Sequence, residues 1–128
     1  MSRKMSVLIV DDEPLLARSV SRYLQKNGYD TEVCDGGTMA IEKLGGRLFD
    51  VLITDLELPD LHGTALIEHV AKSDFNGRII VISGHAGMPP NQKNHKTLHI
   101  SYLNKPFDLE HLLDHVRGTA PRASWAGK

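Results

Sequence analysis

Three four-residue stretches of this chain are apolar almost without interruption, namely Val7–Val10, Val51–Thr54 and Ile79–Ile82. None of them alternates apolar with polar residues, as a strand with one face in water would. Strands that are covered on both faces, as in parallel sheets, show this uninterrupted pattern. We therefore predict a parallel β-sheet with these three strands at its centre and helices packed on both of its faces.

The segments between these stretches predict helices and two further strands. Apolar residues recur at helical spacing in four segments, 15–24, 39–44, 64–70 and 109–116, the last with Asp108 as its N-cap. Asn27-Gly28 and Gly45-Gly46 are typical of the ends of the first two helices. Weaker strands are predicted at Thr31–Cys34 and His99–Leu103. The alternation of strands and helices predicts a doubly wound α/β domain with a five-stranded parallel sheet.

The length of 128 residues suits one compact domain. We predict that the folded unit covers residues 1–117 and that 118–128 is a flexible C-terminal tail. No apolar run approaches the roughly 20 residues that a membrane span needs. The apolar stretch behind the basic N-terminus is also too short for a signal peptide. We expect a cytoplasmic protein without membrane association.

The charge balance argues against direct nucleic acid binding. Lys and Arg total 15 and Asp and Glu total 16, so the chain has no general attraction to nucleic acid or anionic lipid. Cys34 is the only cysteine, which excludes an internal disulfide and fits a reducing compartment. We interpret Cys34 as a small buried strand residue rather than a reactive thiol.

Carboxylates follow two of the apolar strands. Asp11 and Asp12 come directly after the first, and Asp55 directly after the second. Sites in doubly wound folds form outside the carboxyl ends of the strands, so these acids meet if the two strands are neighbours. Clustered carboxylates raise each other's pKa unless a cation lies among them. A small number of oxygen ligands suits Mg²⁺, which often bridges carboxylates to a phosphoryl group.

A hydroxyl and an ammonium group follow the two remaining strands of this sheet edge. Ser83 comes after Ile79–Ile82, and Lys105 comes shortly after His99–Leu103. A lysine and a metal offset the charge of a phosphorylated carboxylate, and a hydroxyl donates to one of its oxygens. The four strand ends together therefore predict a phosphorylation site.

From about Ser6 to Val116 the chain resembles the receiver domains of bacterial response regulators. The resemblance rests on four motifs in the family's order and spacing. They are the acidic turn Asp11-Asp12-Glu13-Pro14, the phosphoacceptor loop Asp55–Gly63, the hydroxyl turn Ile82–His85 and the lysine motif Tyr102–Phe107. The resemblance implies a flavodoxin-like receiver fold in a two-component signalling system, and a phosphorylation-dependent switch rather than an enzyme.

The resemblance also implies roles for the acidic residues. Asp55 would accept the phosphoryl group from a histidine kinase or a phosphotransfer protein, in a reaction that needs Mg²⁺ as cofactor. Asp12 would bind Mg²⁺ directly and Asp11 partly through water. Asp55 itself and the backbone carbonyl of Glu57 would complete the metal site. The Glu57 side chain departs from the family at a variable position where residues tune the access of water.

Further roles fall on residues of the last two motifs. Lys105 would bind a phosphoryl oxygen, and Ser83 would donate a hydrogen bond to another. Tyr102 would be the switch aromatic that moves inward with Ser83; the alternative is a packed aromatic of an edge strand. The Lys105-Pro106 peptide is expected to be cis, as is usual in the family. His85 is a second variable position, which we interpret as an exposed loop residue.

The segment between the fourth and fifth strands departs from the family pattern. Residues 84–97 hold only Ala86 and Met88 as apolar residues, contain Pro89-Pro90 and show no helical stripe to bury. We predict that the helix usual here is absent, short or displaced. The result would be an unusual output surface or homodimer surface. The alternative is a polar helix of one or two turns after Pro90.

Three other interpretations carry less weight. His111 and His115 lie four apart, but no His-Glu-x-x-His pattern or cysteine accompanies them, so we interpret them as exposed helix residues. A phosphatase or phosphotransferase with an aspartyl phosphate usually has its nucleophile in an Asp-x-Asp arrangement, whereas Asp11 and Asp12 are adjacent. In a flavin-binding module of flavodoxin-like fold, the acidic first turn would repel the flavin phosphate.

Overall fold

The computed structural model describes residues 4–84 and 99–118, and within them five parallel strands form one sheet in the order β2-β1-β3-β4-β5. The strands are β1 Ser6–Val10, β2 Asp30–Cys34, β3 Val51–Asp55, β4 Arg78–Ser83 and β5 His99–Asn104. The three uninterrupted apolar stretches form the three central strands. The predicted doubly wound α/β fold is therefore confirmed.

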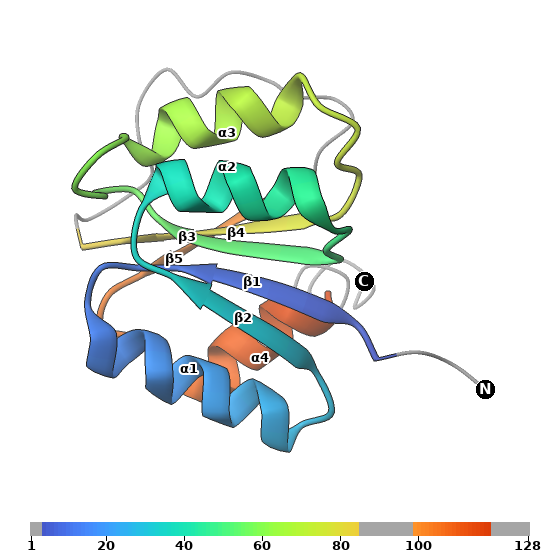
Figure 1. The fold of residues 1–128 in the computed structure, drawn as a ribbon. Coiled ribbons are helices and arrows are strands. Elements are labelled where there is room, and N and C mark those ends of the chain that lie inside the picture. The colour runs from blue at the N-terminus through green and yellow to red at the C-terminus, as the bar shows by residue number, and fades with distance from the viewer. Residues whose placement is uncertain (1–3, 85–98, 119–128) are drawn as a thin grey trace, which may run out of the picture.

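Helices cover both faces of the sheet, as Figure 1 shows, with α2 and α3 on one face and α1 and α4 on the other. Their bounds in the described residues are α1 Pro14–Lys26, α2 Gly37–Gly46, α3 Gly63–Ala71 and α4 Leu109–Arg117. Pro14 stands in the first turn of α1, where its missing N–H group would have no helical partner. The fold thus leaves both edges of the sheet, β2 and β5, at the sides of the molecule.

Two apolar layers lie between the sheet and its helices. Successive strand residues point to opposite faces, so Leu8 and Leu52 pack in the layer beneath α2 and α3. Ile9 and Ile53 pack in the layer beneath α1 and α4. Because each central strand buries both faces, none of its positions could be polar without a partner, and this explains the missing alternation in the sequence.

Asp108 and Gly118 flank the two ends of α4. Asp108 is the N-cap residue, but its side chain makes no capping hydrogen bond. Gly118 follows the helix with φ 73°, a left-handed conformation that glycine adopts without steric cost. The predicted tail beyond Gly118, and the predicted absence of a helix within 85–98, lie outside the described residues.

None of the helices in the described ranges has the length and apolar character that crossing a membrane requires.

Cys34 is buried at the end of β2, as the sequence predicted. Burial raises the pKa of its thiol to about 11, so the thiolate is disfavoured at neutral pH.

Candidate functional site

Three carboxylates converge at the carboxyl edge of the sheet. The parallel register pairs Val10 with Thr54, so the residues that follow β1 lie beside the end of β3. Asp11 and Asp55 are only 4% and 6% exposed, whereas Asp12 faces solvent. Each of the three offers one carboxylate oxygen, and these oxygens lie within 4.8 Å of one another. The predicted meeting of the acids is therefore observed.

Backbone hydrogen bonds orient the two buried carboxylates. Oδ1 of Asp11 accepts from the backbone N–H of Glu13 at 2.9 Å, and Oδ1 of Asp55 accepts from that of Glu57 at 3.0 Å. A side chain at Gly63 would bring its Cβ to 2.7 Å from the Asp55 carbonyl oxygen, so the loop closes only with glycine there. The loop after β3 thereby holds Asp55 in a defined position.

The cluster has the donor set that a hard divalent cation takes. Burial raises the pKa of Asp11, a rise opposed by the backbone hydrogen bond from Glu13 and by the charge of Lys105. The charge of Asp55 adds to the rise. A cation among the three carboxylates would relieve both the burial of charge and the repulsion, and Mg²⁺ is satisfied by a few carboxylate oxygens with water.

The Glu57 side chain is exposed and stands outside the three-carboxylate cluster of the described residues. The metal role that the sequence predicts for Glu57 concerns its backbone carbonyl, and it stays a prediction.

Lys105, which directly follows β5, reaches the cluster. Its Nζ lies 2.9 Å from Oδ2 of Asp55 and 3.9 Å from Oδ2 of Asp11. Burial lowers the pKa of the ammonium group, but the hydrogen bond to Asp55 and the surrounding carboxylates outweigh this and raise it. The backbone N–H of Lys105 donates to the carbonyl of Ser83 at 2.7 Å. The Lys105-Pro106 peptide is cis, as the resemblance implied.

Ser83 and Tyr102 occupy the places that the sequence assigned them. Ser83 is buried at the end of β4, opposite Asn104 of β5. Tyr102 packs partly buried against the layer beneath α2 and α3. Its hydroxyl oxygen is buried and has no hydrogen-bond partner among residues 4–84 and 99–118. Burial also raises the pKa of this hydroxyl. Its role as a switch stays a prediction.

Two acidic residues with contacts at the site were not singled out from the sequence. Oε1 of Glu13 lies 3.4 Å from Nζ of Lys105, which extends the negative surroundings of this ammonium group. Asp60 accepts hydrogen bonds from the backbone N–H groups of Gly37 and Thr38 at 2.9 and 3.1 Å. Asp60 thus caps α2, whose own N-cap residue is a glycine, and ties the loop that follows Asp55 to that helix.

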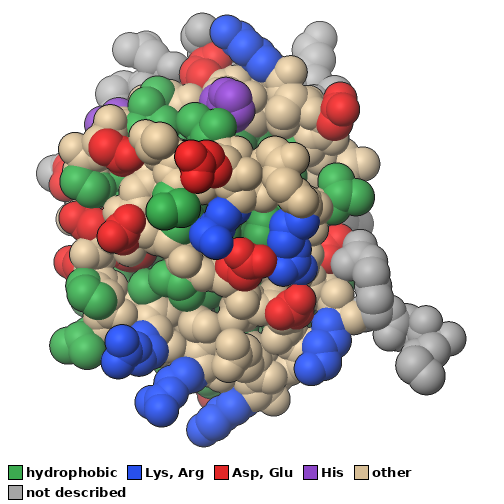
Figure 2. Space-filling model, in the orientation of Figure 1, with side chains coloured by type: hydrophobic (Ala, Val, Ile, Leu, Met, Phe, Trp, Pro, Cys, Tyr) green, Lys and Arg blue, Asp and Glu red, His purple; other side chains and the backbone are tan. Residues whose placement is uncertain are grey.

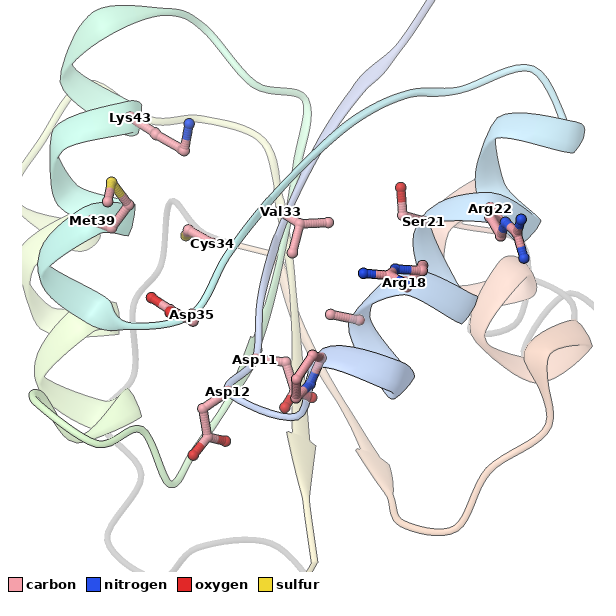
Figure 3. A pocket seen from close by; sticks show the side chains of 12 residues that line it. Asp11, Asp12, Arg18, Ser21, Arg22, Val33, Cys34, Asp35, Met39 and Lys43 are labelled. Carbon is pink, nitrogen blue, oxygen red and sulfur yellow. The ribbon is translucent and has the colours of Figure 1, made fainter.

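A groove leads from the carboxylates across the edge of the sheet. It has a volume of about 600 Å³ and is lined by residues of α1, β2 and α2 together with Asp11 and Asp12. Figure 3 shows the two aspartates at the end of β1 and Arg18 reaching from α1 towards β2. The site is therefore open to solvent on the side of Asp12, which leaves room for an incoming group.

The surface charge is uneven in the view of Figure 2. Acidic side chains are frequent on the left, the side where β1 and β2 of Figure 1 end, whereas most Lys and Arg side chains lie in the middle and at the bottom of this face. An ion-pair network also joins β2 to α2 and its C-cap residue, with Glu32 contacting Lys43 at 3.0 Å and Arg47 at 2.6 Å. Negative charge is thus concentrated near the site.

Comparisons with known proteins agree with this geometry. Residues 7–117 match the family model for the response regulator receiver domain. Transcriptional regulatory protein TrcR of Mycobacterium tuberculosis is 34% identical over 118 residues, which are 92% of this chain and 46% of that protein. The solved receiver domain of the Francisella response regulator 1452 is 27% identical with a TM-score of 0.81, and the match covers 94% of this chain and 99% of that one.

Response regulator TrrA of Thermotoga maritima, solved in complex with Mg(2+)-BeF, shares the fold at 23% identity and a TM-score of 0.78. That match covers 90% of this chain and 98% of the other. The chain spans about half the length of the first curated relatives, 46% and 55% of them. From the family match over residues 7–117 and the carboxylate edge described above, the chain belongs to the response regulator receiver domain family.

Proposed function

We propose that Asp55 accepts a phosphoryl group from a histidine kinase or a phosphotransfer protein, in a reaction that depends on Mg²⁺. The observation that carries this proposal is the convergence of the Asp11 and Asp12 carboxylates and the Lys105 ammonium group on the buried carboxylate of Asp55. The solved complex of TrrA with Mg(2+)-BeF supports the choice of metal.

In the reaction, a carboxylate oxygen of Asp55 attacks phosphorus, and the bond from phosphorus to the donor nitrogen or acyl oxygen breaks. Asp11, Asp12, Asp55 and the Glu57 carbonyl would hold the metal, which would offset charge on the phosphoryl oxygens. Lys105, already 2.9 Å from Oδ2 of Asp55, binds one of these oxygens. Catalysis consists mainly of positioning these charges before the donor arrives.

The product is an acyl phosphate that water consumes, so the domain acts as a timed switch and not as an enzyme with a separate substrate. New contacts of the phosphoryl oxygens bias the switch. Ser83 donates to one oxygen, and Tyr102 follows it inward. The Tyr102 hydroxyl is buried and has no hydrogen-bond partner in the described residues. The inward move would change the groups that surround this hydroxyl. The altered surface then acts on a partner, a second copy or an output domain in the cytoplasm.

The phosphodonor reaches the site across the first turn of α1. Leu15 is 77% exposed there, three positions after Asp12 in the sequence. A large apolar side chain so exposed, close in sequence to the carboxylate cluster, fits a contact with a donor protein. Donors without a protein surface, such as acetyl phosphate, need no such contact.

The test is phosphorylation of the purified chain by acetyl phosphate. With Mg²⁺ the chain should gain the mass of one phosphoryl group, in a form that is stable to acid and labile to base. Peptide mapping after reduction of the acyl phosphate with borohydride should place it at Asp55. A chain that gains no phosphate with Mg²⁺, or gains it elsewhere, contradicts the proposal.

A further inference from the structure

We propose that His111 and His115 bind a divalent transition-metal ion, such as Zn²⁺ or Ni²⁺, at a site separate from the carboxylate cluster. The two residues lie one turn apart on α4, and their ring centroids are 6.3 Å apart with an angle of 70° between the ring planes. Residues four apart on a helix present neighbouring side chains on one face.

The separation of the rings is close to what a shared ion requires. Two imidazole nitrogens that each lie about 2 Å from one ion hold the ring centroids roughly 5–6 Å apart. His111 is exposed and can close the remaining distance by a small side-chain rotation. No backbone change is needed, because both residues lie within the regular part of α4.

The structure also supplies an anchor for one ligand. Nδ1 of His115 lies 3.0 Å from the hydroxyl oxygen of Ser101 on β5. When Nδ1–H donates to that hydroxyl, Nε2 carries the lone pair that a metal binds. Metal-binding histidines nearly always use their other ring nitrogen in such a bond, which fixes both tautomer and orientation. The sequence had indicated two merely exposed residues, but His115 is half-buried and held in place by β5.

The electrostatic surroundings keep His115 in the form that binds metal. Burial lowers its pKa, and the charges of His111 and Arg78 lower it further, against an opposite effect of Asp114. A metal binds neutral imidazole, so the lowered pKa of His115 favours binding. Both histidines line a pocket of about 500 Å³ beside β5 that also includes Asp108, whose carboxylate does not cap the helix. Water in this pocket completes the coordination.

Ligand chemistry separates this site from the site at Asp55. Imidazole nitrogen suits Zn²⁺, Ni²⁺ and Cu²⁺, whereas Mg²⁺ takes oxygen ligands. An excess of Mg²⁺ therefore occupies the carboxylates and leaves the histidine pair available. The proposal does not rest on phosphorylation, so its failure and that of the proposed function are independent.

The test is a calorimetric titration of the whole chain with Zn²⁺ near neutral pH in excess Mg²⁺. We expect one equivalent to bind in a phase that is lost in both His111→Gln and His115→Gln. Ser101→Ala should weaken this phase by roughly 10- to 100-fold, as loss of such an outer hydrogen bond does elsewhere. His69→Gln, which changes an exposed histidine on α3, is the matched control and should leave the phase unchanged.

Circular dichroism checks that each variant is folded, and His111→Gln changes an exposed side chain. Zn²⁺ binding of unchanged affinity in His111→Gln and His115→Gln, or no binding by the unaltered chain, overturns the proposal.

Discussion

The ammonium nitrogen of Lys105 lies 2.9 Å from Oδ2 of Asp55, although 50 positions separate the two residues in the chain. The contact is possible because β5 and β3 flank β4 in parallel, so their carboxyl ends share one edge. Lys105 compensates part of the charge of the buried cluster, and under the proposed function it would bind a phosphoryl oxygen on Asp55. This contact motivates the first prediction.

Asp55→Asn should abolish phosphorylation by acetyl phosphate while the fold stays intact. The amide keeps the shape of the side chain but lacks the nucleophilic oxygen. Intact mass spectrometry measures the phosphoryl group, and circular dichroism measures the fold. Asp74→Asn, at an exposed position away from the cluster, is the control and should be phosphorylated like the unaltered chain. Phosphate retained by Asp55→Asn would move the acceptor to another residue.

Millimolar Mg²⁺ should raise the melting temperature of the chain, and Asp12→Ala should lose most of this rise. The ion binds the folded cluster but not the unfolded chain, so mass action stabilises the fold. A melting temperature insensitive to Mg²⁺ would count against the metal site.

Without Mg²⁺, Asp11→Asn should be more stable than the unaltered chain at neutral pH. The pKa of Asp11 is raised by burial, so its ionised form lowers the stability of the fold. This loss of stability diminishes as the pH falls towards that pKa.

Leu15→Ala should slow phosphorylation by a cognate histidine kinase roughly fivefold or more, as expected when about 1 kcal/mol of binding is lost. Phosphorylation by acetyl phosphate should stay unchanged, because that donor makes no surface contact. Leu48→Ala is the matched control, since Leu48 is 86% exposed and precedes β3 at the opposite end of the sheet. Equal kinase rates for both variants would exclude a special role for Leu15.

Tyr102→Phe should raise the free energy of unfolding by about 1 kcal/mol in the unphosphorylated chain. A buried hydroxyl without a partner loses its bonds to water on folding, and removing it avoids that loss. The Tyr102 hydroxyl has no partner among the described residues. Urea unfolding of the two proteins gives the difference, and a clear destabilisation by Phe would show that the hydroxyl has a stabilising partner.

Raising the pH from 9 to 11 should destabilise the unaltered chain more than Cys34→Ala. The thiol pKa is raised from 9.0 to about 11 in the fold, so the unfolded chain ionises first. The stability contributed by this group is complete below pH 9 and is lost as the pH rises through about 11. Urea unfolding of both proteins at each pH isolates the effect, because other alkaline titrations are common to both. If the free energies of unfolding of the two proteins differ by the same amount at pH 9 and pH 11, burial of the thiol is contradicted.

The sequence alone determined the sheet, its central strands and the edge that carries the site. Uninterrupted apolar stretches mark strands buried on both faces, and the first polar residue after each stretch marks its carboxyl end. Because parallel strands share one such edge, the sequence alone places Asp11, Asp55 and Lys105 together. These features depend on local periodicity and strand order, both of which the chain carries in its residue pattern.

Only the tertiary structure decided the contacts that depend on how separate elements lie against each other. Asp60 caps α2 across 23 positions of sequence, and His115 bonds to Ser101 because α4 packs beside β5. Likewise, Glu13, which precedes α1, contacts Lys105, which follows β5, because both residues lie at the shared carboxyl edge of the sheet. Such contacts are set by side-chain rotamers and by the packing of whole layers, so no local pattern of apolar and polar residues encodes them.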